Sequence, residues 1–164
     1  MKTFAEIFVE VYTPTLETMG FKRKRSVFHK LVNDKIVLAL SHRRYGPEFT
    51  IQFDFWPLCD GGDMIVFMDS SYLLHDIVSD LKHHDYWTCK IEKCEADLHE
   101  SLAYCKNTVF EYFDRITDYQ SYFDCVYKIE EERGLYDIKY QTIPYLHLSH
   151  FHNTFLALGQ FVLL

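Results

Sequence analysis

The chain has 164 residues, of which 48% are hydrophobic, 17% aromatic and 25% charged, and its formal net charge is −7. This length corresponds to one domain, residues 1–164, and the composition excludes the disordered, collagen-like and low-complexity classes of protein. Neither the aromatic content nor the acidity points to an activity by itself.

The cysteines and the N-terminal segment bear on the compartment. Five cysteines, an odd number, are widely spaced along the chain, which favours a reducing environment over a disulfide framework. Glu6, Glu10 and Glu17 interrupt the apolar residues of the N-terminal segment, so no signal peptide is predicted. Every apolar run is also shorter than the roughly 18 residues that a membrane span needs. We therefore expect a cytoplasmic protein without a membrane segment.

The first predicted element is an amphipathic helix. Residues 3–19 place their apolar side chains largely on one helical face and their glutamates elsewhere. Pro14 removes a hydrogen bond within this segment, which predicts a kink or a division into two shorter helices. Gly20 predicts a left-handed cap at the end of the helix.

The following 50 residues favour strands. Asn33 and Asp34 form a two-residue turn signal between two apolar segments, which predicts a β-hairpin. The polar residues 42–47 predict a link, and the strict alternation after it predicts a strand with one core face and one wetter face. The predicted strands are residues 21–32, 35–41, 48–56 and 64–68.

The rest of the chain favours helices. Four helical segments are predicted, opened by Ser70 or Ser71, by Ile91, by Asp118 and by Pro144. The second is the longest, because apolar residues recur at steps of three and four from Ile91 to Tyr112, which predicts one continuous helix of about seven turns. The third ends at Arg133 and Gly134. Strands followed by helices predict an α+β fold, in which an antiparallel meander sheet of four to five strands in the N-terminal half packs against an N-terminal helix and several C-terminal helices.

One family is similar to this pattern. The residues that carry the resemblance are the N-terminal helix, Gly20-Phe21-Lys22-Arg23-Lys24, Val27-Phe28-His29-Lys30, Phe49-Thr50-Ile51-Gln52-Phe53, Tyr86-Trp87 and Tyr112-Phe113-Asp114. Over residues 4–118 the sequence resembles the bacterial domain of unknown function 4304 family. It departs from the family at residues 57–62 and in the segment after Pro144. The resemblance implies an α+β fold and a bacterial cytoplasmic origin, and it implies no catalytic residue because the family has no assigned reaction.

Metal and catalytic motifs are not found in the sequence. His147 and His150 are the best metal ligands by spacing, but no second pair of ligands accompanies them as zinc sites require, and no metal or cofactor is predicted. The chain has no nucleophile elbow and no phosphate-binding loop. Its clustered carboxylates fit solvated helix faces. No catalytic residue is therefore predicted.

The basic residues are concentrated near the N-terminus. Residues 1–50 carry nine Lys and Arg against five Asp and Glu, whereas residues 51–164 carry eight against nineteen. Four of these nine basic residues form the run from Lys22 to Arg25. In a strand such a run points to alternate faces and gives no continuous phosphate track, so nucleic acid is disfavoured as a partner. The simpler interpretation is that these residues protect a strand edge from pairing with another chain.

A recognition surface is the remaining candidate site, and it uses residue types that are common in binding hot spots. The candidates are Arg43, Arg44 and Tyr45 in a hairpin loop, Trp56 on the outer side of its strand, and Asp85, Tyr86 and Trp87 in a loop between helices. Each aromatic side chain among them has an alternative role as a plug at the end of the core.

Two functions follow from these observations. The first is a non-catalytic module that binds another protein through its acidic helical face or its aromatic loops, such as the immunity partner of a bacterial toxin. The second is an enzyme or small-ligand binder with a pocket between sheet and helices that uses His29, Arg43, Asp54 or Trp56. The oligomeric state does not follow from the sequence.

Overall fold

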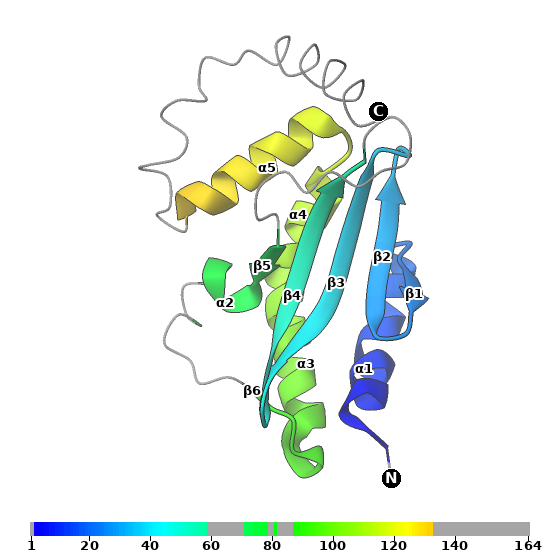
Figure 1. Ribbon diagram of the computed structural model, residues 1–164, viewed down its shortest axis with the longest axis vertical. Helices are drawn as coiled ribbons and strands as arrows, with labels where there is room; N and C mark the ends of the chain where they lie inside the picture. The colour runs from blue at the N-terminus through cyan, green and yellow to red at the C-terminus, as the bar shows by residue number, and fades with distance from the viewer. Residues whose placement is uncertain (1, 59–70, 79–80, 82–86, 133–164) are drawn as a thin grey trace, which may run out of the picture.

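The protein consists of an antiparallel sheet with helices packed on one of its faces, as the computed structural model shows for residues 2–58, 71–78, 81 and 87–132 (Figure 1). The elements in chain order are α1 (Phe4–Thr18), β1 (Lys22–Lys24), β2 (Val27–Val32), β3 (Ile36–Tyr45), β4 (Glu48–Pro57), β5 (Ser71–Leu73), α2 (Leu74–Ile77), β6 (Trp87–Thr88), α3 (Ile91–Asn107), α4 (Val109–Arg115) and α5 (Tyr119–Glu132). The predicted α+β class, with an N-terminal helix, a sheet in the N-terminal half and several later helices, is confirmed. The predicted strand 64–68 and the predicted helix from Pro144 lie outside the described residues.

Helix α1 is well capped at both ends. Thr3 and Glu6 form a reciprocal capping box at its start. At its end Gly20 has φ +83°, and the Phe21 and Gly20 amides donate to the carbonyls of Leu16 and Glu17, which is the Schellman arrangement. The predicted left-handed cap is thus confirmed.

The predicted division of this helix at Pro14 is wrong, because residues 4–18 form one helix. Pro14 lies on the exposed side, where water can hydrate the carbonyl that loses its amide partner. Residues on both sides of it, among them Phe8, Val11 and Leu16, are buried, and this shared packing holds the two halves in one element.

Strands β1 to β5 form a meander with neighbours in sequence order. The hairpin predicted at Asn33 and Asp34 is confirmed, and both residues have the positive φ (49° and 56°) that a type I′ turn requires. The segment predicted as one strand over residues 21–32 is instead two strands, because Arg25 also has a positive φ (57°) and reverses the chain into the β1–β2 hairpin.

Strand β3 is longer than predicted. Residues 42–45 were assigned to a polar link by their composition, but they continue the ladder to Tyr45, which pairs with Glu48. The link shrinks to Gly46 and Pro47, and Gly46 has φ +62°. The backbone of a polar segment pairs as well as that of an apolar one when a long partner strand lies beside it, which a composition argument overlooks.

Two short strands complete the sheet by pairing with β4. Ser71–Leu73, predicted as the start of a helix, forms β5, and the helical part is limited to the short α2 after it. Trp87 and Thr88, predicted as a loop between helices, form β6 and pair with Phe49 and Glu48. Both corrections have one cause, which is that the free edge of β4 offers unpaired backbone groups that nearby segments satisfy.

The long helix predicted from Ile91 to Tyr112 is two helices. Thr108 departs from helical geometry (φ −138°, ψ −68°) and separates α3 from α4. Across the break Val109, Phe110, Tyr112 and Phe113 are all buried, which is a wider apolar face than one stripe of a straight helix provides. The break therefore turns α4 so that it packs more side chains into the core. The Asp118 cap of α5 is confirmed, since its carboxylate accepts from the Ser121 amide at 2.8 Å.

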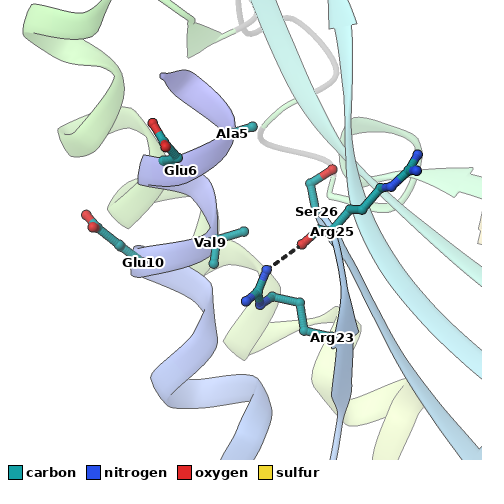
Figure 2. Close-up of a pocket in the computed structure, with 7 residues that line it drawn as sticks. All are labelled: Ala5, Glu6, Val9, Glu10, Arg23, Arg25 and Ser26. Carbon is teal, nitrogen blue, oxygen red and sulfur yellow. Dashed lines mark hydrogen bonds between the residues drawn. The ribbon is translucent and has the colours of Figure 1, made fainter. Parts of the chain in front are cut away.

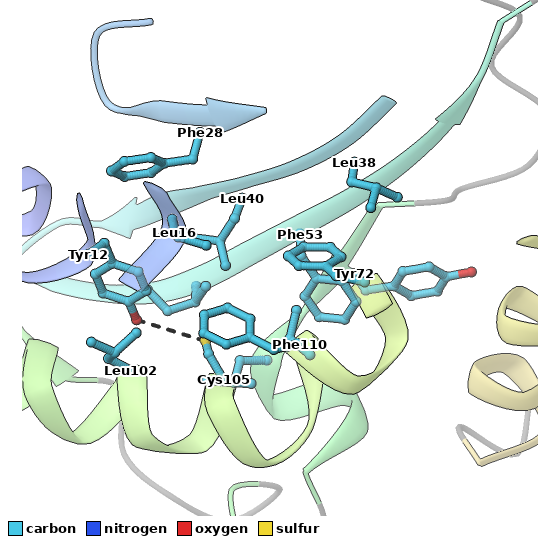
Figure 3. Packing of buried hydrophobic residues seen from close by; sticks show 14 of the residues in the cluster. Tyr12, Leu16, Phe28, Leu38, Leu40, Phe53, Tyr72, Leu102, Cys105 and Phe110 are labelled. Carbon is cyan, nitrogen blue, oxygen red and sulfur yellow. Dashed lines mark hydrogen bonds between the residues drawn. The ribbon is translucent and has the colours of Figure 1, made fainter. Parts of the chain in front are cut away.

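The core lies between the sheet and helices α1, α3 and α4 (Figure 3). Phe8 of α1 contacts Phe28 of β2 with 5.9 Å between ring centroids, and Phe113 of α4 contacts Phe55 of β4 at 5.8 Å. The Tyr12 hydroxyl lies 2.9 Å from the Ser101 hydroxyl and links α1 to α3 inside this core. We call the helix-covered side of the sheet the core face and the opposite side the outer face.

Candidate protein-interaction surface

Three of the residues predicted to recognise a partner lie on the outer face of the sheet. Arg43 pairs with Thr50, Tyr45 with Glu48, and Val37 with Trp56. Cross-strand partners share a face and successive residues alternate, so Arg43, Tyr45 and Trp56 point to the side opposite Phe49 and Phe55 of the core. The predicted outer position of Trp56 is confirmed, whereas the loop predicted for Arg43 and Tyr45 is wrong, because both belong to β3.

Arg44 lies on the other face of the same strand. Its guanidinium carbon is 5.8 Å from the centre of the Phe4 ring of α1, its Nη2 donates to the Gly46 carbonyl at 3.4 Å, and the residue is exposed. Burial raises the pKa of the Cys89 thiol, and the charge of Arg44 opposes this effect. The sequence grouped Arg44 with its neighbours, but the strand separates it from them and places it beside the core.

Trp87 belongs to the core rather than to a recognition loop. Its ring stacks on Phe49 with 5.9 Å between centroids, and its indole nitrogen donates to Glu100 of α3 at 3.1 Å. Trp87 therefore closes the end of the core, which was the alternative to a role in recognition. Asp85 and Tyr86 lie outside the described residues.

The outer face also carries most of the exposed large hydrophobic side chains of the described residues. Among the described residues four large hydrophobic side chains are exposed, and their exposed fractions are 38% for Val27, 49% for Leu31, 37% for Tyr45 and 51% for Tyr127. Val27 and Leu31 lie on the outer face, because the side chains of β2 alternate and Phe28 beside Val27 is buried against α1. Tyr45 lies on the same face by the register of β3 with β4. They share one face of the sheet but not one end of it, because Leu31 pairs with Val37 near the start of β3 and Tyr45 is the last residue of that strand.

Arg43 and Tyr45 form a preorganised pair within this surface. The guanidinium carbon of Arg43 lies 5.5 Å from the centre of the Tyr45 ring. Such cation–π stacking orders both side chains before a partner arrives, which reduces the entropy lost on binding. We refer to Val27, Leu31, Arg43, Tyr45 and Trp56 together as the outer-face patch.

A buried polar group lies beside this patch. Asp54 is on the outer face of β4, and it accepts a hydrogen bond from the Gln52 amide at 3.2 Å, while the same amide reaches the Ser71 hydroxyl at 2.9 Å. Burial raises the pKa of Asp54 even though the bonds to Ser71 and Gln52 oppose the shift. Farther along β4 the Thr50 hydroxyl lies 3.4 Å from Nδ1 of His75. These contacts fasten β5 and α2 to the edge of β4.

The described cysteines belong to the core. The four cysteines Cys89, Cys94, Cys105 and Cys125 are buried and unbridged. Burial raises the pKa of each thiol, that of Cys105 to about 12, which suppresses the reactive thiolate. Among the described residues no group of three or more His, Cys, Asp and Glu is placed to hold a metal ion, and His147 and His150 lie outside them.

The residues that sequence reasoning missed are Val27 and Leu31. Both were assigned to an apolar strand without regard to side, although their spacing with the buried Phe28 gives the alternation that separates the two faces. Their exposure depends on which face the helices cover. The sequence therefore predicts that Val27 and Leu31 share one face of the strand, but it does not predict which face the helices leave uncovered.

No helix in the described part of the chain has the length and apolar character needed to cross a membrane. Comparison with known proteins gives no match to this chain among family models, curated proteins or solved structures.

Proposed function

We propose that the protein is a non-catalytic interaction module that binds another protein through the outer-face patch. The observation that carries this proposal is that Val27, Leu31 and Tyr45 account for three of the four exposed large hydrophobic side chains among the described residues and share one face of the sheet. A patch that combines apolar side chains with Arg and Tyr has the composition of an interface centre.

The geometry supports a flat docking surface more than a ligand pocket. Figure 1 shows α1, α3 and α4 on the opposite side of the sheet, and the space between them and the strands is filled by the buried side chains of the core. A small ligand needs a concave site with converging polar groups. A protein partner instead needs an extended surface with a few anchoring side chains, which the outer-face patch supplies.

The role of immunity partner to a bacterial toxin is the form of this proposal that the sequence favours. It agrees with the resemblance to the domain of unknown function 4304 family, with a bacterial and cytoplasmic origin, and with the small size of the chain. Helix α1 carries three glutamates and no basic residue, but it lies on the side of the sheet away from the outer-face patch, so its charge steers a basic partner only at long range. The partner is then a basic protein encoded beside this one.

The test is a binding measurement with matched variants. The product of the neighbouring gene is titrated into wild-type protein, Leu31→Asp, Tyr45→Ala and Tyr127→Ala, the last removing the exposed aromatic of α5 that lies outside the patch. We expect Leu31→Asp and Tyr45→Ala each to weaken binding by about tenfold or more, the effect of truncating an interface anchor. Tyr127→Ala should bind like the wild type.

Two results would contradict the proposal. One is equal affinity of all four proteins, and the other is a loss confined to Tyr127→Ala. Thermal unfolding of each variant separates a lost interface from a lost fold, since Leu31, Tyr45 and Tyr127 are exposed and their replacement leaves the core unchanged.

A further inference from the structure

A groove lies between α1 and the β1–β2 hairpin, away from the outer-face patch (Figure 2). It encloses about 430 Å³, within the range of small-ligand and peptide sites. Its lining residues are Ala5, Glu6, Val9, Glu10, Arg23, Arg25 and Ser26. Strand β1 is three residues long and stands at the edge of the sheet, beside β2.

The acidic side chains of the groove already have partners. Glu6 accepts from the Thr3 backbone amide at 2.7 Å and from the Thr3 hydroxyl at 2.9 Å. Glu10 accepts from the Lys2 ammonium at 2.7 Å. Figure 2 shows both glutamate side chains on the side of α1 that faces away from the hairpin. Neither carboxylate is therefore the group that a ligand would engage first.

The basic side chains of the groove keep most of their donors. Arg23 gives one bond, from Nη1 to the Arg25 carbonyl at 2.9 Å, and this bond fixes its guanidinium at the mouth of the groove. Within the parts of the chain that the structure describes, neither Arg23 nor Arg25 has an acidic group at ion-pair distance. Lys22 and Lys24 flank them on the same strand. The free N–H donors of the groove therefore suit a carboxylate, because a guanidinium group can donate two parallel hydrogen bonds to it.

The floor of the groove is apolar. Ala5 and Val9 are one helical turn apart on α1, and Figure 2 shows both pointing toward the hairpin. An apolar side chain that enters between them and the strands gains free energy from burial that a simple inorganic anion does not. The groove accordingly combines a carboxylate site with an adjacent apolar site.

We propose that this groove binds a short acidic segment of a partner protein, in which a carboxylate residue lies next to an apolar residue. Figure 2 shows the Arg23 guanidinium turned toward α1 and that of Arg25 turned away from it, so the carboxylate pairs with Arg23, and Arg25 adds positive charge nearby. The apolar side chain rests on Ala5 and Val9. The apolar contact on Ala5 and Val9 favours such a segment over a nucleic acid backbone, which has no apolar side chain to place there. This site is separate from the outer-face patch and does not depend on its function.

The experiment uses a fluorescent, end-blocked hexapeptide of alternating glutamate and leucine, titrated with the full chain at low salt. The same protein is titrated with a matched glutamate and serine peptide and with a duplex DNA of mixed sequence. The variants are Arg23→Ala combined with Arg25→Ala, Val9→Ser, and a control in which Lys106→Ala and Arg115→Ala remove the same charge from α3 and α4.

The wild type should bind the glutamate and leucine peptide more tightly than either other probe. The double arginine variant should weaken that binding by about two- to fivefold, as expected for the loss of one exposed ion pair, and the control should not. Val9→Ser should weaken the leucine peptide and leave the serine peptide unchanged. All of these residues lie at the surface or at the rim of the core, so each variant should unfold near the wild-type temperature.

Any of three outcomes would overturn the inference. The first is a wild type that fails to bind the peptide, and the second is equal binding by the double arginine variant. The third is binding of the serine peptide or the DNA as tight as that of the leucine peptide, which would make the basic hairpin a general anion surface.

Discussion

His42 is expected to make the stability of the protein depend on pH. Its imidazole lies on the core face of β3 between two rings of α1, with centroid distances of 5.0 Å to Phe4 and 4.8 Å to Phe8. Both ring nitrogens are buried without a hydrogen-bond partner. Burial lowers the pKa of His42, and the positive charge of Arg44 on the same strand lowers it further.

The sign of the effect follows from proton binding in the two states. The unfolded chain protonates His42 near its ordinary pKa of 6.5, whereas the folded protein does so only at lower pH. Below pH 6.5 the unfolded state therefore binds more protons, and the free energy of unfolding falls as the pH falls. The slope from one such group reaches at most about 1.4 kcal/mol per pH unit, and it vanishes below the folded pKa.

The substitution His42→Phe isolates this contribution. Phenylalanine keeps the edge-to-face packing against Phe4 and Phe8 and removes two buried polar atoms without partners, whose burial costs about 1–3 kcal/mol. At pH 7 we expect the variant to be more stable than the wild type by about 1 kcal/mol, and between pH 6.5 and 5 its stability should fall less steeply.

The assay is urea unfolding at half-unit pH intervals from 5 to 8, with His99→Gln as the control because His99 is exposed on α3. The control should keep the slope of the wild type. If His42→Phe keeps that slope as well, or is less stable than the wild type at pH 7, the argument from the buried imidazole is wrong.

Further predictions concern other buried polar groups and one glycine. Asp54→Asn should raise the free energy of unfolding at pH 7 by roughly 0.5–1 kcal/mol, because burial disfavours the charged carboxylate, and in urea titrations the gain should shrink as the pH falls and the native Asp54 takes up a proton. Tyr12→Phe and Ser101→Ala should each cost about 1–2 kcal/mol, and a double-mutant cycle should show strong coupling; additive losses would mean that their 2.9 Å contact contributes nothing. Gly20→Ala should lower the midpoint of thermal unfolding through a loss of about 1 kcal/mol, because alanine is strained at φ +83°, and an unchanged midpoint would contradict the role of the cap.

The candidate surface was only partly predictable. The residue types Arg43, Tyr45 and Trp56 were found from the sequence because they are the ones that interfaces prefer. Their common face followed only after β3 was seen to continue past Ser41, since a loop has no alternation that relates one side chain to another. Arg44 and Trp87 were grouped with them by sequence, and the ladder places both against the core instead.

What the sequence determined by itself is local. The left-handed Gly20, the turn at Asn33 and Asp34 and the cap at Asp118 each depend on interactions within a few residues, so single positions were sufficient to predict them.

Tertiary structure decided everything that depends on which segments meet. The free edge of β4 makes strands of Ser71–Leu73 and Trp87–Thr88, and the common packing across Pro14 keeps α1 in one piece. The break at Thr108 follows from the shape of the core that α4 has to fill. In each case the free energy comes from contacts between residues far apart in the chain, and this long-range packing also determines which face of the sheet remains open to a partner.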